Sequence, residues 1–231
     1  YYYPKKFEVF TPVSAEDYDH FAGDDKLEKH KEKIFNRYKN SLLYSDELIA
    51  NFMVSMRAHA QARNEEIAFV ITGDHGEEFW DTGPFLGHGA STMVDHRVRV
   101  PLVTCGIPIE NKRLTHTSNA MIWPTVMDWL SEGAIDFRRY PQIPSSFLQE
   151  SPNTVASYSL RYPRNASMFA VYHGDKKFSG KLFYQQKRAE LLKINDNDLT
   201  TIIPEEQLFW NKFSNEMIQN LMELERDALA P

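Results

Sequence analysis

The sequence of 231 residues holds a single cysteine, Cys105, so no framework of internal disulfide bonds can support the fold. It lacks any run of 18 apolar residues and therefore predicts no membrane-spanning helix within this stretch. It also lacks a cluster of basic residues, and the formal net charge of −6 argues against nucleic acid as a partner. The remaining composition, 42% apolar and 25% charged, is typical of a globular protein with one substantial core.

The stretch from Ile67 to Gly89 carries the strongest chemical signal. Residues 68–72 are apolar or β-branched without polar alternation, which predicts a strand buried on both faces. Glycines then flank the adjacent pair Asp74-His75 and predict a turn where the strand ends. Neighbouring side chains of a regular strand point to opposite faces, whereas in such a turn they can converge.

A convergent carboxylate and imidazole suit Zn²⁺ or Mn²⁺, so Asp74 and His75 are candidate metal ligands. His88 follows between two glycines, in a second place where the backbone can approach a ligand closely. Open α/β sheets bind ligands at the carboxyl ends of their strands, which is where this pair is expected. The alternative is a plain strand-to-loop turn with a capping Asp74 and a surface histidine.

The rest of the chain divides into a main part and a smaller one. Apolar residues at helical spacing predict helices over Phe35–Ala60 and His116–Leu130, and a strand is expected over Val98–Thr104. The stretch Arg138–Pro152 is rich in proline and serine and marks a boundary. We therefore predict a main domain over residues 1–140 and a small C-terminal subdomain over residues 141–231.

The C-terminal subdomain is predicted to combine a small antiparallel sheet with a final helix. Four short strand-like runs separated by turns form the sheet: Thr154–Leu160, Ser167–Tyr172, Lys181–Tyr184 and Glu190–Ile194. The helix is predicted over Pro204–Ala228. Its apolar stripe, expected to cover the sheet, consists of Leu208, Phe213, Met217, Leu221 and Leu224.

The motifs TGDHGEEF at 72–79, LGHG at 86–89 and RVPLV at 99–103 strongly resemble the C-terminal half of sulfatases. The wider group is the alkaline-phosphatase superfamily, which includes the phosphoethanolamine and phosphoglycerol transferases. The resemblance implies part of the α/β sandwich of that superfamily, with the helix that begins near Phe35 packed beside the sheet. Met121 departs from the pattern, because sulfatases usually carry an aspartate at that position.

The resemblance also implies roles for individual residues. Asp74 and His75 would be two ligands of a catalytic divalent metal (Zn²⁺, Mn²⁺ or Ca²⁺), and His88 would lie near the sulfate or phosphate group as a catalytic and substrate-binding residue. Arg99 could offer a charge to a sulfate or phosphate oxygen, although a salt bridge at the strand edge is the plainer interpretation. Glu77 is a candidate general base, but a local role is favoured.

The implied function is that of a metal-dependent sulfatase-like hydrolase acting on sulfate or phosphate esters. The chain starts at Tyr1 without a methionine, so we expect a fragment whose N-terminal half supplies the nucleophile and the other metal ligands. The fragment alone is then predicted to be inert. The family's habits suggest an extracytoplasmic or periplasmic protein held at the inner membrane through that N-terminal half.

Three other interpretations stay open. The full protein could be a phosphoethanolamine- or phosphoglycerol-type transferase, a direction favoured by His88 where many sulfatases have lysine. It could be a non-catalytic, membrane-associated binding protein with a sulfatase-like fold, although a site without catalysis has no need for Asp74, His75 and His88 together. It could also be a metal-free structural domain.

Overall fold

A computed structural model of the chain divides into two compact units, which are described separately. One unit comprises Tyr1–Gly89 with Arg99–Pro108, and the other comprises Ala90–Val98 with Ile109–Pro231. The predicted boundary after residue 140 lies outside the described residues, so it stays a prediction. The backbone is described for residues 1–13, 29–81, 83, 86–88, 93–107, 116–133, 135–136, 139, 146, 148, 154–159, 166–183, 185–195, 197–199 and 201–228.

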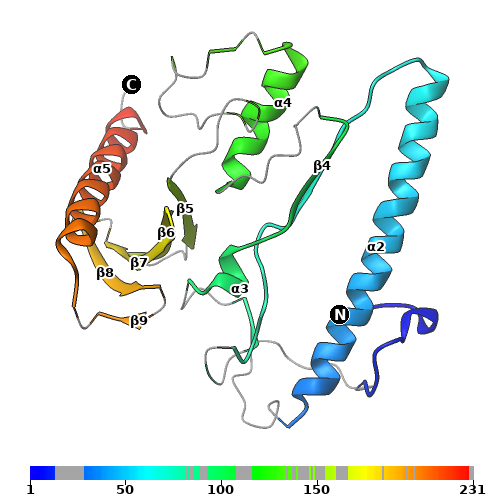
Figure 1. Ribbon diagram of the computed structural model, residues 1–231, viewed down its shortest axis with the longest axis horizontal. Helices are drawn as coiled ribbons and strands as arrows, with labels where there is room; N and C mark the ends of the chain where they lie inside the picture. The colour runs from blue at the N-terminus through cyan, green and yellow to red at the C-terminus, as the bar shows by residue number, and fades with distance from the viewer. Residues whose placement is uncertain are drawn as a thin grey trace. The chain divides into compact units, whose positions relative to one another are not determined.

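The first unit is dominated by the long helix α2, Lys31–Ala62, which confirms and extends the predicted helix (Figure 1). It ends where the N–H of Arg63 bonds to the carbonyl of Ala60 and where Asn64 takes a left-handed φ of 54°, a conformation that asparagine tolerates better than most residues. The short 3₁₀ helix η1, Lys5–Phe7, precedes it.

Helix α2 packs beside the two-stranded sheet of this unit, as the resemblance implied: the rings of Phe52 and Phe69 meet edge to face with centroids 6.5 Å apart, and Arg57 donates a hydrogen bond to Sγ of Cys105 at 2.7 Å. The described residues do not cover the apolar face of α2 along its whole length. Leu48 is 50% exposed and Phe52 is 60% exposed. A helix of 32 residues spans about 48 Å, whereas a strand of 4 residues spans about 14 Å. The two short strands of this unit are therefore too small to cover the helix.

Strand β1, Phe69–Thr72, pairs antiparallel with β4, Leu102–Cys105, in a two-stranded sheet. The prediction that β1 is buried on both faces is wrong for this chain, because its side chains are half-buried or exposed. The physical reason is that β1 pairs with a single strand among the described residues. Strand β4 starts later than predicted because Val98 ends the short helix α3, Asp95–Val98, and Pro101 cannot donate to a ladder.

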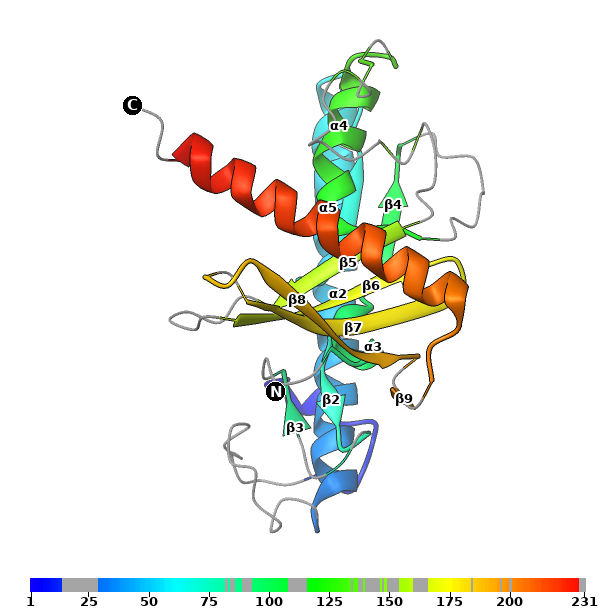
Figure 2. The same cartoon turned by 90° about the vertical axis from the view of Figure 1, so that its left-hand side faces the viewer.

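A second, smaller hairpin follows β1 and returns the chain toward it. Strand β2, Glu78–Phe79, pairs antiparallel with β3, Leu86–Gly87, as Figure 2 shows. Aromatic rings pack around it, with the ring of Tyr38 on α2 lying 4.7 Å from that of Phe79 between centroids. The hairpin is therefore held against α2.

The second unit contains the predicted antiparallel sheet, which is a five-stranded meander in sequence order. Tight turns join its central strands, with Gly174 at a left-handed φ of 59° between β6 and β7. The strands are β5 Thr154–Ser159, β6 Ala166–His173, β7 Lys176–Phe183, β8 Arg188–Ile194 and β9 Asn197–Asp198.

Helix α5, Pro204–Ala228, has the predicted bounds and lies across one face of this sheet (Figure 2). The rings of Phe169 on β6 and Trp210 on α5 stack with centroids 5.8 Å apart, and Met217 is buried beside them. Leu208, predicted in the covering stripe, is instead 73% exposed. It is out of phase with Trp210 and Met217, which lie seven residues apart on the buried side. The side chains of the predicted Leu221 and Leu224 lie outside the described residues.

The predicted helix over His116–Leu130 is shorter than expected. It begins with the 3₁₀ turn η2, Asn119–Met121, and continues as α4, Ile122–Leu130. The Ser118 hydroxyl accepts a hydrogen bond from the N–H of Ala120 at 3.3 Å and so caps the turn. No helix within the described part of the chain combines the length and apolar content needed to cross a membrane.

Candidate active site

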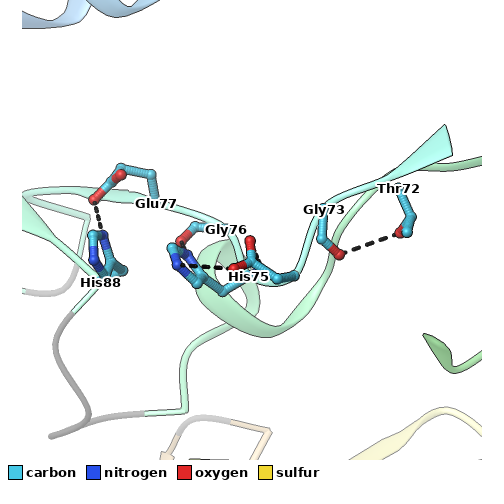
Figure 3. A network of polar contacts seen from close by, with 7 residues as sticks. Thr72, Gly73, His75, Gly76, Glu77 and His88 are labelled. Carbon is cyan, nitrogen blue, oxygen red and sulfur yellow. Dashed lines mark hydrogen bonds and ion pairs between the residues drawn. The ribbon is translucent and has the colours of Figure 1, made fainter. Parts of the chain in front are cut away.

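Asp74 and His75 lie in the turn that follows β1. Oδ1 of Asp74 accepts a hydrogen bond from the backbone N–H of His75 at 3.0 Å. Nδ1 of His75 lies 3.0 Å from the carbonyl oxygen of Gly76 (Figure 3). A carbonyl oxygen can only accept, so this contact places the proton on Nδ1 and leaves Nε2 with its lone pair.

The candidate ligand atoms of the two side chains lie close together. Nε2 of His75 lies 3.7 Å from Oδ2 of Asp74. Two ligands that each sit about 2.1 Å from one ion can be at most about 4.2 Å apart, so both atoms can contact a single metal. The hydrogen bond from the N–H of His75 is the main cause that lowers the pKa of Asp74. The carboxylate is therefore ionised at neutral pH, as a metal ligand must be.

Asp74 and His75 cannot complete a metal site by themselves. Among the residues that the structure describes, no group of three or more His, Cys, Asp or Glu side chains is arranged to hold a metal ion. A divalent metal in a protein usually takes four or more ligands. Asp74 and His75 fit a metal site as two of its ligands, and their role as ligands stays a prediction.

The structure brings His88 to this pair. His88 follows β3, and its ring stacks on the ring of His75 with centroids 4.3 Å apart and an interplanar angle of 27°. The β2–β3 hairpin produces this contact because it reverses the chain directly after the turn that holds Asp74 and His75. The three residues singled out in the sequence therefore form one cluster.

Glu77 joins the cluster in a way that sequence reasoning did not identify. Its Oε1 lies 3.3 Å from Nδ1 of His88, and its side chain is only 16% exposed. The hairpin pairs Glu78 with Gly87, so the same register places Glu77 opposite His88 on one face. In the sequence, only the hairpin register could have revealed this contact. Two strands of two residues each carry too little pattern to predict that register.

Two half-buried tyrosines lie near Glu77. The pKa of Tyr1 and that of Tyr38 are both raised, first by burial and then by the nearby negative charge of Glu77. The rings of Tyr1 and Tyr38 meet edge to face with centroids 5.0 Å apart. This side of the site is thus more apolar than the side occupied by Asp74, whose side chain is 90% exposed.

The predicted substrate residue Arg99 is exposed and follows α3 directly. Its neighbour Arg97, by contrast, is buried at 6% exposure. The described contacts do not assign Arg99 to the cluster around His75, and its role stays a prediction.

Comparison with known proteins gives a family match and two curated relatives. The model of the sulfatase family matches residues 1–132. The phosphatidylethanolamine transferases Mcr-1 and Mcr-2 of Escherichia coli are 31% and 30% identical to the chain over 87 residues. Each alignment covers 38% of this chain and 14% of the relative, so the chain spans a small part of these proteins.

Two solved structures resemble the chain more distantly. A Bacteroides thetaiotaomicron VPI-5482 protein assigned as a sulfatase aligns with a TM-score of 0.46 and 15% identity, covering 70% of this chain and 37% of that one. The 2-O GAG sulfatase BT1596 aligns with a TM-score of 0.36 and 16% identity, covering 68% and 35%.

Proposed function

Because the chain belongs to the sulfatase family of the alkaline-phosphatase superfamily, we propose that it is the C-terminal part of a metal-dependent enzyme that cleaves or transfers a sulfate or phosphate ester. The observation that carries this proposal is the cluster of Asp74, His75 and His88. Nε2 of His75 and Oδ2 of Asp74 lie 3.7 Å apart, and the ring of His88 stacks on the ring of His75 with centroids 4.3 Å apart. A plain surface turn has no need for this arrangement.

Each residue of the cluster has a distinct task in this proposal. Asp74 and His75 hold the metal, which when bound would polarise the ester and lower the pKa of a hydroxyl nucleophile. His88 lies beside His75, where its imidazole can bind a non-bridging oxygen or give a proton to the leaving group. The hydrogen bond from Nδ1 of His75 to the Gly76 carbonyl fixes which nitrogen faces the metal.

An enzyme that transfers the group to an acceptor other than water is a second candidate function, and one observation favours it. The two curated relatives at 31% and 30% identity are both named phosphatidylethanolamine transferases. Under this alternative the cluster would serve to move a phosphate-linked headgroup to an acceptor rather than to water. The same residues could serve both branches, because both break a bond between oxygen and phosphorus or sulfur.

The remaining parts of the site are proposed to come from the N-terminal half of the same protein. That half would supply the nucleophile and the other metal ligands, and the present chain alone would be inert. The exposed apolar residues of α2, and the pairing of β1 with one strand among the described residues, support a further neighbour of the first unit in the full protein. We also propose that this half anchors the protein at the membrane on the extracytoplasmic side, in keeping with relatives whose names specify a lipid.

The proposal is tested by offering the full-length protein an aryl sulfate, an aryl phosphate and a phosphodiester with a separate acceptor. Wild type is compared with Asp74→Ala and His88→Ala, and with Asp46→Ala as an exposed acidic control on α2. We expect turnover of one ester class, lost in the two site variants and kept in the control. If no ester is turned over, the enzyme proposal fails, and a non-catalytic membrane-associated binding protein becomes the better interpretation.

A further inference from the structure

We propose that Glu77 is a positioning residue for His88: its carboxylate accepts the Nδ1 proton and so presents Nε2 to the substrate group. This inference rests on the proposed function, because it assigns the orientation of the residue that would act on the ester. It concerns a contact of 3.3 Å between Oε1 of Glu77 and Nδ1 of His88, shown in Figure 3.

The backbone makes the contact a built feature rather than a chance approach of two surface side chains. The β2–β3 ladder pairs Glu78 with Gly87, and Glu77 and His88 are the next residues along the two chains at the open end of the hairpin. Side chains opposite each other in an antiparallel pair lie on the same face, with their Cβ atoms about 5 Å apart. The hairpin therefore sets both the direction and the separation of the two groups.

The burial of Glu77 strengthens the interaction. Its side chain is 16% exposed, compared with 90% for the neighbouring carboxylate of Asp74. Tyr1 and Tyr38 lie close enough for its charge to raise the pKa of both phenols, beyond the effect of their own burial. Less water competes for a carboxylate in such surroundings, so the hydrogen bond to His88 is stronger than an exposed pair would be.

The chemistry of the two groups explains what the contact achieves. An ionised carboxylate can only accept, so it selects the form of His88 that carries a proton on Nδ1. That choice puts the reactive lone pair or proton of His88 on Nε2. Glu77 acts through His88 and is not itself required to touch the ester.

The inference is tested first by the tautomer of His88, which does not depend on activity. The side-chain nitrogens of the 231-residue chain are observed by ¹⁵N NMR with labelled histidine, and His88→Gln identifies the signals. We expect an Nδ1-protonated ring in wild type and a shift toward the Nε2-protonated form in Glu77→Ala. Glu77→Gln keeps the shape of the side chain and removes its charge, so it should also move the His88 signals. Glu65→Ala, a carboxylate removal outside the cluster, should leave them unchanged.

The second test is kinetic and uses the full-length protein with its preferred ester. We expect Glu77→Ala to lower kcat about 10–100-fold, by analogy with the loss when the hydrogen-bond partner of a metal-bound histidine is removed, with KM changed less than twofold. Glu77→Asp should recover part of the loss. Unchanged His88 signals in both Glu77→Ala and Glu77→Gln would overturn the inference while leaving the proposed function in place. A wild-type protein without turnover would overturn the proposed function, whereas the tautomer result would still decide the contact.

Discussion

Replacement of Asp95 by alanine should destabilise the second unit, because Asp95 neutralises a buried lysine. Nζ of Lys177 on β7 lies 2.8 Å from Oδ1 of Asp95, and the lysine side chain is only 6% exposed. The hydroxyl of Tyr172 on β6 donates a hydrogen bond to the same oxygen at 2.7 Å. The pair therefore joins helix α3 to the centre of the five-stranded sheet.

The magnitude follows from the different burial of the two partners. Removing one member of a fully buried ion pair typically costs about 3–5 kcal/mol, because the other charge stays buried without it. The side chain of Asp95 is 39% exposed, so water can partly replace it, and the expected loss is about 2–3 kcal/mol. For a chain of this size, that loss lowers the melting temperature by about 5–10 °C.

Urea unfolding followed by far-UV circular dichroism measures this effect on the 231-residue chain. Glu216→Ala is the matched control, because Glu216 is 61% exposed and lies 3.9 Å from Lys212, a pair expected to contribute less than about 0.5 kcal/mol. The double variant Asp95→Ala with Lys177→Met should be more stable than Asp95→Ala alone, since it also removes the buried positive charge of Lys177. If Asp95→Ala is as stable as the control, Asp95 does not neutralise a buried charge of Lys177 in the folded state.

Two further predictions concern the same unit. Gly180→Ala should lower the free energy of unfolding by about 1–3 kcal/mol, because an added Cβ would press on the ring of Phe169 and the carbonyl of Glu190; wild-type stability in urea would contradict this. Lys176 donates a hydrogen bond to Glu206, and this bond lowers the pKa of the Glu206 carboxyl from its ordinary 4.5. The ion pair therefore stabilises the folded state above pH 4.5, and this stabilisation is lost as the pH falls through the lower pKa of Glu206 in the folded state. Glu206→Gln should therefore melt below wild type at pH 7 and together with it at the acid end of the titration, and a constant difference across pH would argue against the ion pair.

The parts of the fold that the sequence predicted best are those with local signals. Helix α5 begins at Pro204, which suits a first helical position, and Glu205 and Glu206 follow in the first turn. Strand β7 was predicted only from Lys181, whereas it begins at Lys176. Its polar first half resembles a turn in sequence, and pairing with β6 on one side and β8 on the other makes it a central strand.

In the candidate site too, features with local sequence signals could be predicted, and contacts that depend on strand pairing could not. The adjacency of Asp74 and His75 and the glycines around His88 are local features, so their clustering could be predicted. The partnership of Glu77 with His88 depends on the register of a hairpin with two residues in each strand, which no local pattern specifies. The exposure of Phe52 on α2 was missed for a related reason: helical periodicity identifies an apolar face but not what covers it.

The assignment of Asp74 and His75 as metal ligands is tested by the metal content of the full-length protein, measured by inductively coupled plasma mass spectrometry after dialysis. Wild type is compared with Asp74→Ala and His75→Ala, with Asp46→Ala as the control. We expect at least one divalent metal per molecule in wild type and in the control, and less than a tenth of that in the two ligand variants. Equal metal content in all four proteins, or none in wild type after incubation with Zn²⁺ or Mn²⁺, would contradict the assignment of Asp74 and His75 as metal ligands.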